Sequence, residues 1–95
     1  MATVVYGDYE WDDEKAAANA RKHGVTFEEA SMALSSDPIA LDLADKAAPS
    51  RVITLAMSPS ERILYVVSTE RGTRLRLISA RIANRHERRI YTEEI

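Results

Sequence analysis

The chain contains no cysteine among its 95 residues and only two histidines, His23 and His86. The absence of cysteine excludes a disulfide framework, a thiolate zinc site and a cysteine nucleophile. Two histidines are too few for a zinc site built from histidine alone. We therefore expect no metal ion and no other cofactor, and chemistry that depends on the remaining charged and polar side chains.

Long apolar runs are missing as well. No stretch approaches the roughly 18 consecutive apolar residues that a membrane-spanning helix needs. Residues 1–10 lack the basic and apolar regions of a secretory signal. These observations predict one globular domain over residues 1–95, with no membrane segment and a cytoplasmic location.

Lysine disappears from the second half of the chain, where every cation of the Lys/Arg type is an arginine. Residues 1–50 hold four Lys or Arg and ten Asp or Glu, whereas residues 51–95 hold nine Arg and five Glu. Seven arginines and one acid, Glu87, fall between Arg71 and Arg89. Because guanidinium groups bind phosphate in bidentate fashion, this cluster favours a polyanionic partner. The alternative is an ordinary solvated surface.

The N-terminal part of the chain predicts a strand and then a helix. Residues 4–11 are rich in Val and Tyr, and Gly7 allows a bend or bulge within this one strand. A helix over residues 15–23 follows, with Asp12 or Asp13 as its N-cap. Three successive alanines favour this helix, and no glycine or proline interrupts it.

A second helix is predicted directly after the first. Gly24 favours the left-handed conformation that ends the first helix. Thr26 and Glu29 have the spacing of a capping box, which begins the second helix, and Asp37-Pro38 ends it.

The rest of the chain reads as strands followed by a helix. The strands are predicted over residues 39–43, 51–57, 62–70 and 74–80, with a turn at 58–61 and a tight hairpin at 71–73. Asn84 and Glu87 have the spacing of another capping box, which begins a C-terminal helix running toward Glu94. The fold class is therefore α+β: an antiparallel β-sheet meander with two N-terminal helices and one C-terminal helix.

Three motifs are similar to those of a known protein family. The first is Trp11-Asp12 followed by Asn19-x-x-Lys22-His23-Gly24-Val25-x-Phe27-x-x-Ala30. The second is Thr69-Glu70-Arg71-Gly72 followed by Arg76-Leu77-Ile78-Ser79-Ala80-Arg81, and the third is Glu87-Arg88-Arg89-x-Tyr91. On these motifs the chain resembles the BrnT toxins from about residue 9 to residue 92.

The resemblance implies a RelE-like fold and the activity of a ribonuclease toxin in a type II toxin–antitoxin system. Such a toxin cleaves RNA and thereby inhibits translation. The resemblance also implies a partner, a BrnA-type antitoxin with a DNA-binding ribbon-helix-helix fold, and we expect the two proteins to form a heterotetramer.

RNA cleavage next to a 2′-hydroxyl needs a base, cations around the phosphorane and an acid for the leaving oxygen, but no metal. Glu70 is a candidate base, because it ends a predicted strand and Arg71 beside it would keep it ionised. Arg71 itself is a candidate RNA-binding residue. The alternative for Glu70 is an ordinary ion pair in the hairpin.

Strand alternation places Arg74 and Arg76 on one face of their strand and Arg81 on the opposite face. Neighbouring arginines repel one another unless an anion lies between them, so Arg74 and Arg76 form a candidate phosphate clamp, with Arg76 as its catalytic member. The alternative is pairing with acids on neighbouring strands: Asp42, Asp45 or Glu61.

Helical spacing aligns Arg81 with Arg85, and Arg85 with Arg88, in one basic stripe. Arg81, at the end of its strand, is a candidate catalytic residue. Arg85 and Arg88 are candidate RNA-backbone contacts, although the stripe would equally suit an acidic surface of the antitoxin or a solvated face.

Four further residues have both a chemical and a structural interpretation. His23 is a candidate general acid and Lys22 a candidate phosphate contact, yet both also suit the negative end of a helix dipole. Tyr91 is a candidate proton donor that would otherwise pack against the sheet. Trp11 is a candidate base-stacking residue that would otherwise anchor the core.

Two other functions remain compatible with the sequence. One is a non-catalytic nucleic-acid-binding or regulatory module that uses the same arginines, and the other is an interaction protein whose basic half docks an acidic partner. Only an enzyme would degrade RNA in the presence of EDTA, and a pure binder would retain salt-sensitive affinity without product.

Overall fold

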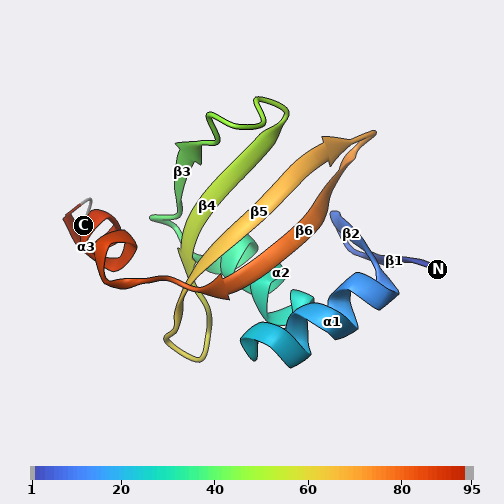
Figure 1. Ribbon diagram of the computed structural model, residues 1–95, viewed down its shortest axis with the longest axis horizontal. Coiled ribbons are helices and arrows are strands. Elements are labelled where there is room, and N and C mark those ends of the chain that lie inside the picture. The colour runs from blue at the N-terminus through green and yellow to red at the C-terminus, as the bar shows by residue number, and fades with distance from the viewer. Residues whose placement is uncertain (1, 94–95) are drawn as a thin grey trace.

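The computed structural model describes residues 2–93, which form one six-stranded sheet with three helices (Figure 1). The elements are β1 Thr3–Tyr6, β2 Tyr9–Asp12, α1 Asp13–His23, α2 Phe27–Ser36, β3 Leu41–Ala44, β4 Arg51–Met57, β5 Ile63–Arg71, β6 Arg74–Ile82 and α3 Arg85–Glu93. The predicted α+β class and the order of its three helices are confirmed. The predicted continuation of the last helix to Glu94 lies outside the described residues. No helix among residues 2–93 has the length and apolarity to cross a membrane.

The prediction of a single first strand over residues 4–11 is wrong. Gly7 has a φ of 60°, a left-handed conformation that glycine adopts without steric cost, and the chain reverses there. β1 and β2 form a tight antiparallel hairpin in which Tyr6 lies opposite Tyr9. The bend expected at Gly7 is therefore a complete turn.

The sheet is also not a meander throughout. Its strand order is β1-β2-β6-β5-β4-β3, and β2 lies parallel to β6, with Glu10 opposite Arg76. The four strands β3 to β6 do form the predicted antiparallel meander. The chain thus places its N-terminal hairpin beside its last strand, on which the candidate arginines lie.

The two N-terminal helices have the caps that the sequence predicts. The side chain of Asp12 accepts a hydrogen bond from Lys15 N, and Gly24 has a left-handed φ of 68°. At α2, Thr26 Oγ1 accepts from Glu29 N at 3.0 Å. Glu29 does not complete the reciprocal bond of a capping box, because its carboxylate binds residues in the loop between β4 and β5 instead.

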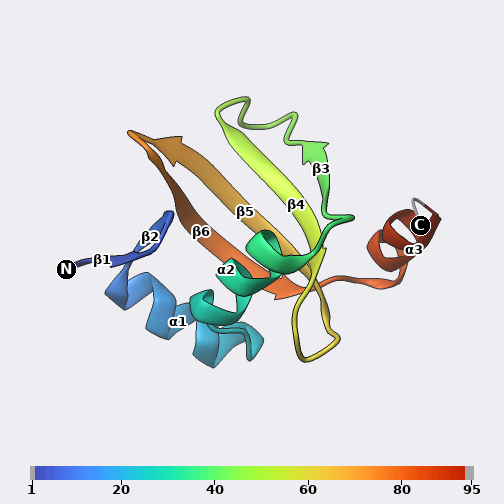
Figure 2. The same ribbon diagram turned by 180° about the vertical axis from the view of Figure 1, so that it is seen from behind.

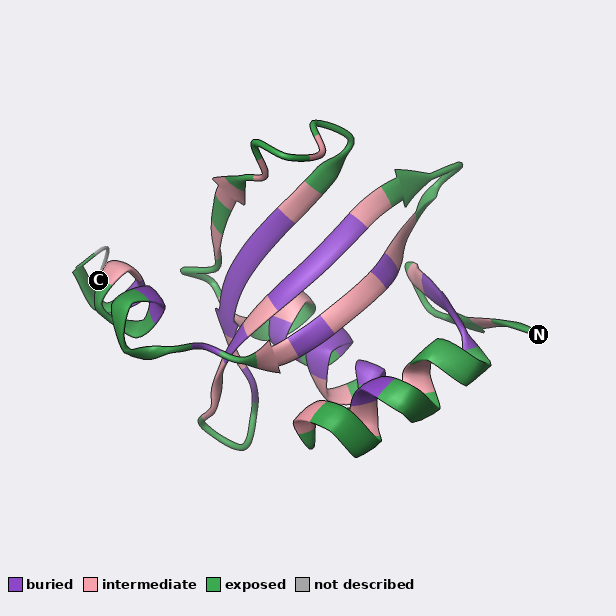
Figure 3. Ribbon diagram, in the orientation of Figure 1, coloured by how far each residue is buried: buried purple, intermediate pink, exposed green. Residues whose placement is uncertain are grey.

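One face of the sheet packs against α1 and α2 and forms the main core (Figure 2). Trp11 and Phe27 contact edge to face, with ring centroids 5.8 Å apart. Leu64 and Val66 of β5 are completely buried beneath the helices. Figure 3 shows the buried residues concentrated in the central strands, where this core lies.

The other face has no helix over most of its area, because α3 packs only at one end, against Leu55 and its neighbours. Tyr91 of α3 donates a hydrogen bond to Oδ2 of Asp37 at 2.6 Å. Asp37 Oδ2 also accepts from Met57 N at 2.8 Å. One carboxylate therefore joins α3, the end of α2 and β4, while the face over β5 and β6 stays uncovered.

A β-bulge in β6 changes which side chains share a face. Val67 lies opposite Ser79, but Ser68 lies opposite Leu77, so Ile78 has no partner on β5. Arg76 and Arg81 lie opposite Thr69 and Tyr65, four residues apart on a regular strand, and therefore point to the same face. The prediction that Arg81 lies opposite Arg76 is wrong, because regular alternation does not allow for the extra residue.

Asn19 fixes α1 against the edge of β6. Its amide group donates to the carbonyl of Ala80 at 2.8 Å and to that of Val25 at 3.0 Å, and its carbonyl accepts from Ala80 N at 3.1 Å. Asn19 thus bonds to Ala80 as a neighbouring strand would, and it also holds the turn between α1 and α2. This one residue determines where the end of α1 lies relative to β6.

Glu29 ties α2 to the loop between β4 and β5. Its carboxylate accepts hydrogen bonds from Arg62, Ser58 and Ser60. The bond from Arg62 lowers the pKa of Glu29 to about 2; burial opposes this shift, and the two serines reinforce it.

We expect Glu29→Gln to flatten the loss of stability in acid. A glutamate titrates near ~4.3 in an unfolded chain, so a folded pKa of about 2 stabilises the protein above that range. This stabilisation is lost as the pH falls from ~4.3 toward about 2. The free energy of unfolding, measured with urea across this range, should fall less steeply in the variant. Glu28→Gln, at an exposed neighbour, is the control, and parallel curves for wild type and Glu29→Gln would contradict the prediction.

Candidate nucleic-acid interface

Arg76 lies on the uncovered face where β6 meets β2. Its Nη1 atom donates to Oε2 of Glu10 at 2.5 Å, and Nε of Arg71 lies 4.0 Å from the same oxygen. The side chain of Arg76 is 21% exposed and that of Arg71 is 64% exposed. Two guanidinium groups therefore share one carboxylate, which leaves a net positive charge at this end of the face.

Arg51 adds a third cation to this part of the face. It lies opposite Thr69, which in turn lies opposite Arg76 on the next strand. Arg51 is exposed, and among residues 2–93 no carboxylate oxygen lies within 4.0 Å of its guanidinium group. Arg51 and Arg76 in this row and Arg71 in the next row thus have one acid, Glu10, near them, and this arrangement favours an anion above them.

Arg81 is the second anchored guanidinium on this face. Nη1 and Nη2 donate to the two carboxylate oxygens of Glu87 at 2.8 and 2.9 Å, and the group lies 3.9 Å from the ring centroid of Tyr65. The hydrogen bonds to Glu87 raise the pKa of Arg81, against the opposing effect of burial. The same bonds lower the pKa of Glu87. A planar cation held in this way presents its remaining N–H groups in a fixed orientation.

Glu87 can hold Arg81 because it also caps α3. Asn84 N donates to Oε1 of Glu87 at 2.9 Å, and Glu87 N donates to Oδ1 of Asn84 at 2.9 Å. This reciprocal pair confirms the predicted capping box at the start of the last helix. The cap therefore fixes the position of the Glu87 carboxylate, and this carboxylate orients Arg81, a candidate catalytic residue.

Two shallow hollows lie along the edge of β6, and residues of α1 line both of them together with residues of β6. Lys22, His23 and Ser79 line one hollow together with Lys15. A second hollow shares Lys15 and extends to Arg76. Ser79 points to the same face as Arg76, because it lies opposite Val67. Cations from a helix and a strand thus border one edge, with an imidazole group among them.

A family model described as the ribonuclease toxin BrnT, of type II toxin–antitoxin systems, matches residues 11–87. The chain belongs to the BrnT family. A crystal structure of the Brucella abortus ribonuclease toxin BrnT is similar, with a TM-score of 0.62 and 28% sequence identity over 79% of this chain and 94% of that one. No curated protein matches the chain. The predictions of a BrnT-like fold and of a ribonuclease toxin with an antitoxin partner are confirmed.

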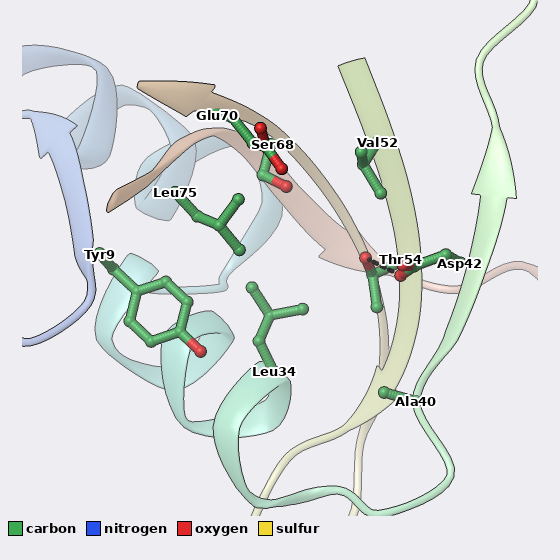
Figure 4. Close-up of a pocket in the computed structure, with 9 residues that line it drawn as sticks. All are labelled: Tyr9, Leu34, Ala40, Asp42, Val52, Thr54, Ser68, Glu70 and Leu75. Carbon is green, nitrogen blue, oxygen red and sulfur yellow. Dashed lines mark hydrogen bonds between the residues drawn. The ribbon is translucent and has the colours of Figure 1, made fainter. Parts of the chain in front are cut away.

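In this member of the BrnT family, Glu70 lies away from the two anchored arginines. It lies opposite Leu75 and on the helix-covered face, where it lines a pocket with Asp42 and Leu34 (Figure 4). Arg76 and Arg81 point to the other face. The sheet therefore separates Glu70 from the cations with which its proposed catalytic role would pair it.

Trp11 and Tyr91 are both buried, with 2% of each residue exposed. Trp11 packs against Phe27, and the hydroxyl group of Tyr91 donates a hydrogen bond to Asp37. Burial, together with the bond to Asp37, raises the pKa of Tyr91 to about 12. The geometry favours a packing role for both residues over base stacking or proton donation.

The remaining candidate arginines lie on exposed parts of the chain. Arg74 lines a hollow with Glu70 and Asp8 near the tip of the β5–β6 hairpin. Arg85 and Arg88 are exposed on α3, and Nη1 of Arg88 donates to the carbonyl of Ala83 at 2.7 Å. None of the three lines the hollows along β6.

Sequence reasoning did not identify several residues of this interface. Glu10 and Tyr65 hold Arg76 and Arg81, yet neither pairing has a local spacing that could be recognised along the chain. Lys15 and Ser79 join the hollows only because α1 lies against β6. Asn19 belonged to the family motif, and that was the one available signal of its role.

Proposed function

We propose that the chain is a metal-independent endoribonuclease that cleaves RNA by attack of a 2′-hydroxyl on the adjacent phosphate. The proposal depends on one observation above all. The bulge at Ile78 aligns Arg76 and Arg81 on the uncovered face, next to the edge hollow that holds Lys22 and His23. Cleavage of this kind would inhibit translation, and it would take place in the cytoplasm.

The roles follow from the chemistry of these groups. Arg76 and Lys22 hold the scissile phosphate, with Arg71 as a further contact for the RNA backbone. Arg81 stabilises the negative charge that develops on the phosphorane, because its orientation is fixed before the substrate binds. His23 transfers a proton to or from the reacting oxygens, since imidazole groups exchange protons near neutral pH.

Glu10 and Glu87 offset the charges of Arg76 and Arg81 but do not remove the positive electrostatic potential of this face. Glu10 is shared by Arg76 and Arg71, and Arg51 in the same row has no acid within reach among residues 2–93. A phosphate that approaches this row gains attraction from more cations than the acids can screen. The carboxylates serve instead to keep each guanidinium in one orientation.

The decisive experiment is cleavage of a synthetic RNA by the purified protein in the presence of EDTA. We expect products that end in a 2′,3′-cyclic phosphate. An oligonucleotide of the same sequence with 2′-deoxyribose at the cleaved position should remain intact, because the attacking hydroxyl is missing. This substrate is the matched control for binding, since it keeps every phosphate.

Two results would contradict the mechanism. Complete loss of activity in EDTA, restored by a divalent ion, would show that a metal is required. Cleavage of the 2′-deoxy substrate would show that the nucleophile is not the 2′-hydroxyl. Salt-sensitive RNA binding with no product at all would favour the rival function, a non-catalytic binding module.

We further propose that the antitoxin of this system is a BrnA-type protein with a ribbon-helix-helix fold, forming a heterotetramer with the toxin. Membership of the BrnT family supports an antitoxin partner. Light scattering of the co-expressed complex would measure its stoichiometry.

A further inference from the structure

A cavity of about 390 Å³ lies on the helix-covered face, on the opposite side of the sheet from the proposed RNA site (Figure 4). Leu34 of α2 and Val52 and Leu75 of the sheet form its apolar walls. Its polar groups come from separate strands, with Asp42 on β3 and Glu70 on β5. A cavity of this size with a few convergent polar groups is suited to one side chain or a small ligand.

The charged groups of this pocket, Asp42 and Glu70, only accept hydrogen bonds when ionised, and Tyr9, Thr54 and Ser68 add hydroxyl groups. Thr54 Oγ1 uses its only proton in a bond to Asp42 Oδ1 at 2.8 Å, which keeps that carboxylate at the pocket wall. Both Asp42 and Glu70 are exposed, and neither has a cation within 4.0 Å among residues 2–93. No lysine, arginine or histidine lines the pocket.

Ser68 contributes a further hydroxyl group to the pocket wall. It is 2% exposed and lines the pocket, and its hydroxyl has no hydrogen-bond partner in the described part of the chain. Figure 4 shows this hydroxyl on the same side of β5 as the carboxylate of Glu70. No buried side-chain nitrogen or oxygen atom among residues 2–93 lacks a hydrogen-bond partner, so this hydroxyl is open to the pocket and free to bond to a group that enters it.

We propose that this pocket binds the guanidinium group of an arginine side chain from the antitoxin, an inference that rests on the toxin–antitoxin function proposed above. Five N–H donors in a planar fork match two carboxylates and a hydroxyl better than the compact ammonium group of lysine does. The walls formed by Leu34 and Leu75 cover the aliphatic stem of the arginine. The two carboxylates repel RNA phosphate, so the pocket is a contact for the protein partner.

The position of the pocket has a consequence for neutralisation. Because the sheet separates Glu70 from Arg76 and Arg81, an antitoxin anchored at the pocket does not by that contact cover the RNA site. Anchoring and inhibition are then separate parts of one interface. A toxin whose pocket is altered should bind its antitoxin more weakly through a faster dissociation rate.

The test is the affinity between the purified toxin and the antitoxin encoded with it, measured by calorimetry for the wild type and for Asp42→Asn/Glu70→Gln. We expect the dissociation constant to rise about tenfold or more for the double variant. Glu14→Gln/Glu28→Gln is the matched control, since it removes the same charge at exposed positions of α1 and α2. The control should bind as the wild type does, and thermal unfolding verifies that both variants are folded.

Arginine-to-glutamine variants of the antitoxin complete the experiment. One of these antitoxin variants should bind the wild-type toxin more weakly than the unchanged antitoxin does. The same variant should cause no further loss of affinity for the Asp42→Asn/Glu70→Gln toxin, because both changes remove the same contact. The proposal is overturned by unchanged affinity of the double variant, by an equal loss of affinity in the control, or by the absence of any antitoxin arginine that couples to the pocket. Loss of toxin self-association alone would assign the pocket to a second copy and overturn it too. Binding is measured without RNA, so failure of the nuclease mechanism would be seen separately, in the cleavage assay.

Discussion

Replacing His23 by glutamine is expected to reduce RNA cleavage at neutral pH by about 10²–10⁴-fold, the usual contribution of a general acid or base. The imidazole lies in the hollow that Lys22 and Ser79 also line, beside the face of Arg76. Glutamine keeps a polar side chain of similar length but cannot exchange a proton near neutral pH. The rate constant should be measured with excess enzyme in a single turnover, so that product release does not mask the chemical step.

Two further variants separate this role from a structural one. His23 is in the last turn of α1 with Arg21, where a cation stabilises the end of the helix dipole. Arg21→Gln removes an exposed cation from the same turn and should leave cleavage almost unchanged. His23→Lys places a cation at the helix end and should remain defective. If lysine restores the rate, or if Arg21→Gln is equally inactive, His23 is a helix-end cation and does not transfer the proton.

Replacing Asn19 by alanine is expected to lower the free energy of unfolding by about 3–5 kcal/mol. The change removes three hydrogen bonds at once and leaves the N–H and C=O groups of Ala80 and the carbonyl of Val25 without partners. Each buried unpaired group costs about 1–3 kcal/mol. A domain of this size has a total stability of only about 5–15 kcal/mol, so part of the population should unfold at physiological temperature.

Urea denaturation measures this loss, with Ala17→Asn as the control. Ala17 is exposed on the same helix, so an asparagine there costs only its lower helix propensity, about 0.7 kcal/mol. Asn19→Asp is a sharper comparison, because its carboxylate can accept from Ala80 N but cannot donate to the two carbonyls. We expect it to be nearly as unstable as Asn19→Ala. A loss below about 1 kcal/mol for Asn19→Ala would contradict the role assigned to this residue.

Much of the local structure could be predicted because its signals lie close together in the sequence. The caps at Asp12, Gly24 and Asn84 depend on residues within one helical turn, and all three are present in the structure. The first hairpin was missed although its signal is local too. Tyr6 lies opposite Tyr9, so the loop consists of Gly7 and Asp8, and a Gly-Asp pair between two β-rich segments favours a hairpin rather than the predicted bend.

The candidate site was predicted only in part. Arg76, Arg81, Lys22 and His23 were all identified from residue type and motif, and the structure places them along one edge and face of the sheet. Glu70 was grouped with them because it is close in sequence, although strand alternation sends its side chain to the other face. Proximity along the chain is a poor guide within a sheet, because neighbouring residues point in opposite directions.

The sequence alone determined the family, the α+β class, the helix caps and the concentration of arginine in the C-terminal half, because each depends on residue type or on spacings within a few positions. The tertiary structure decided which of those arginines share a face and which acids hold them. One extra residue at Ile78 reverses the alternation of β6, and Glu10 reaches Arg76 only through a strand pairing between positions 66 residues apart. Contacts of that range depend on how the whole sheet is assembled, so no local pattern in the chain specifies them.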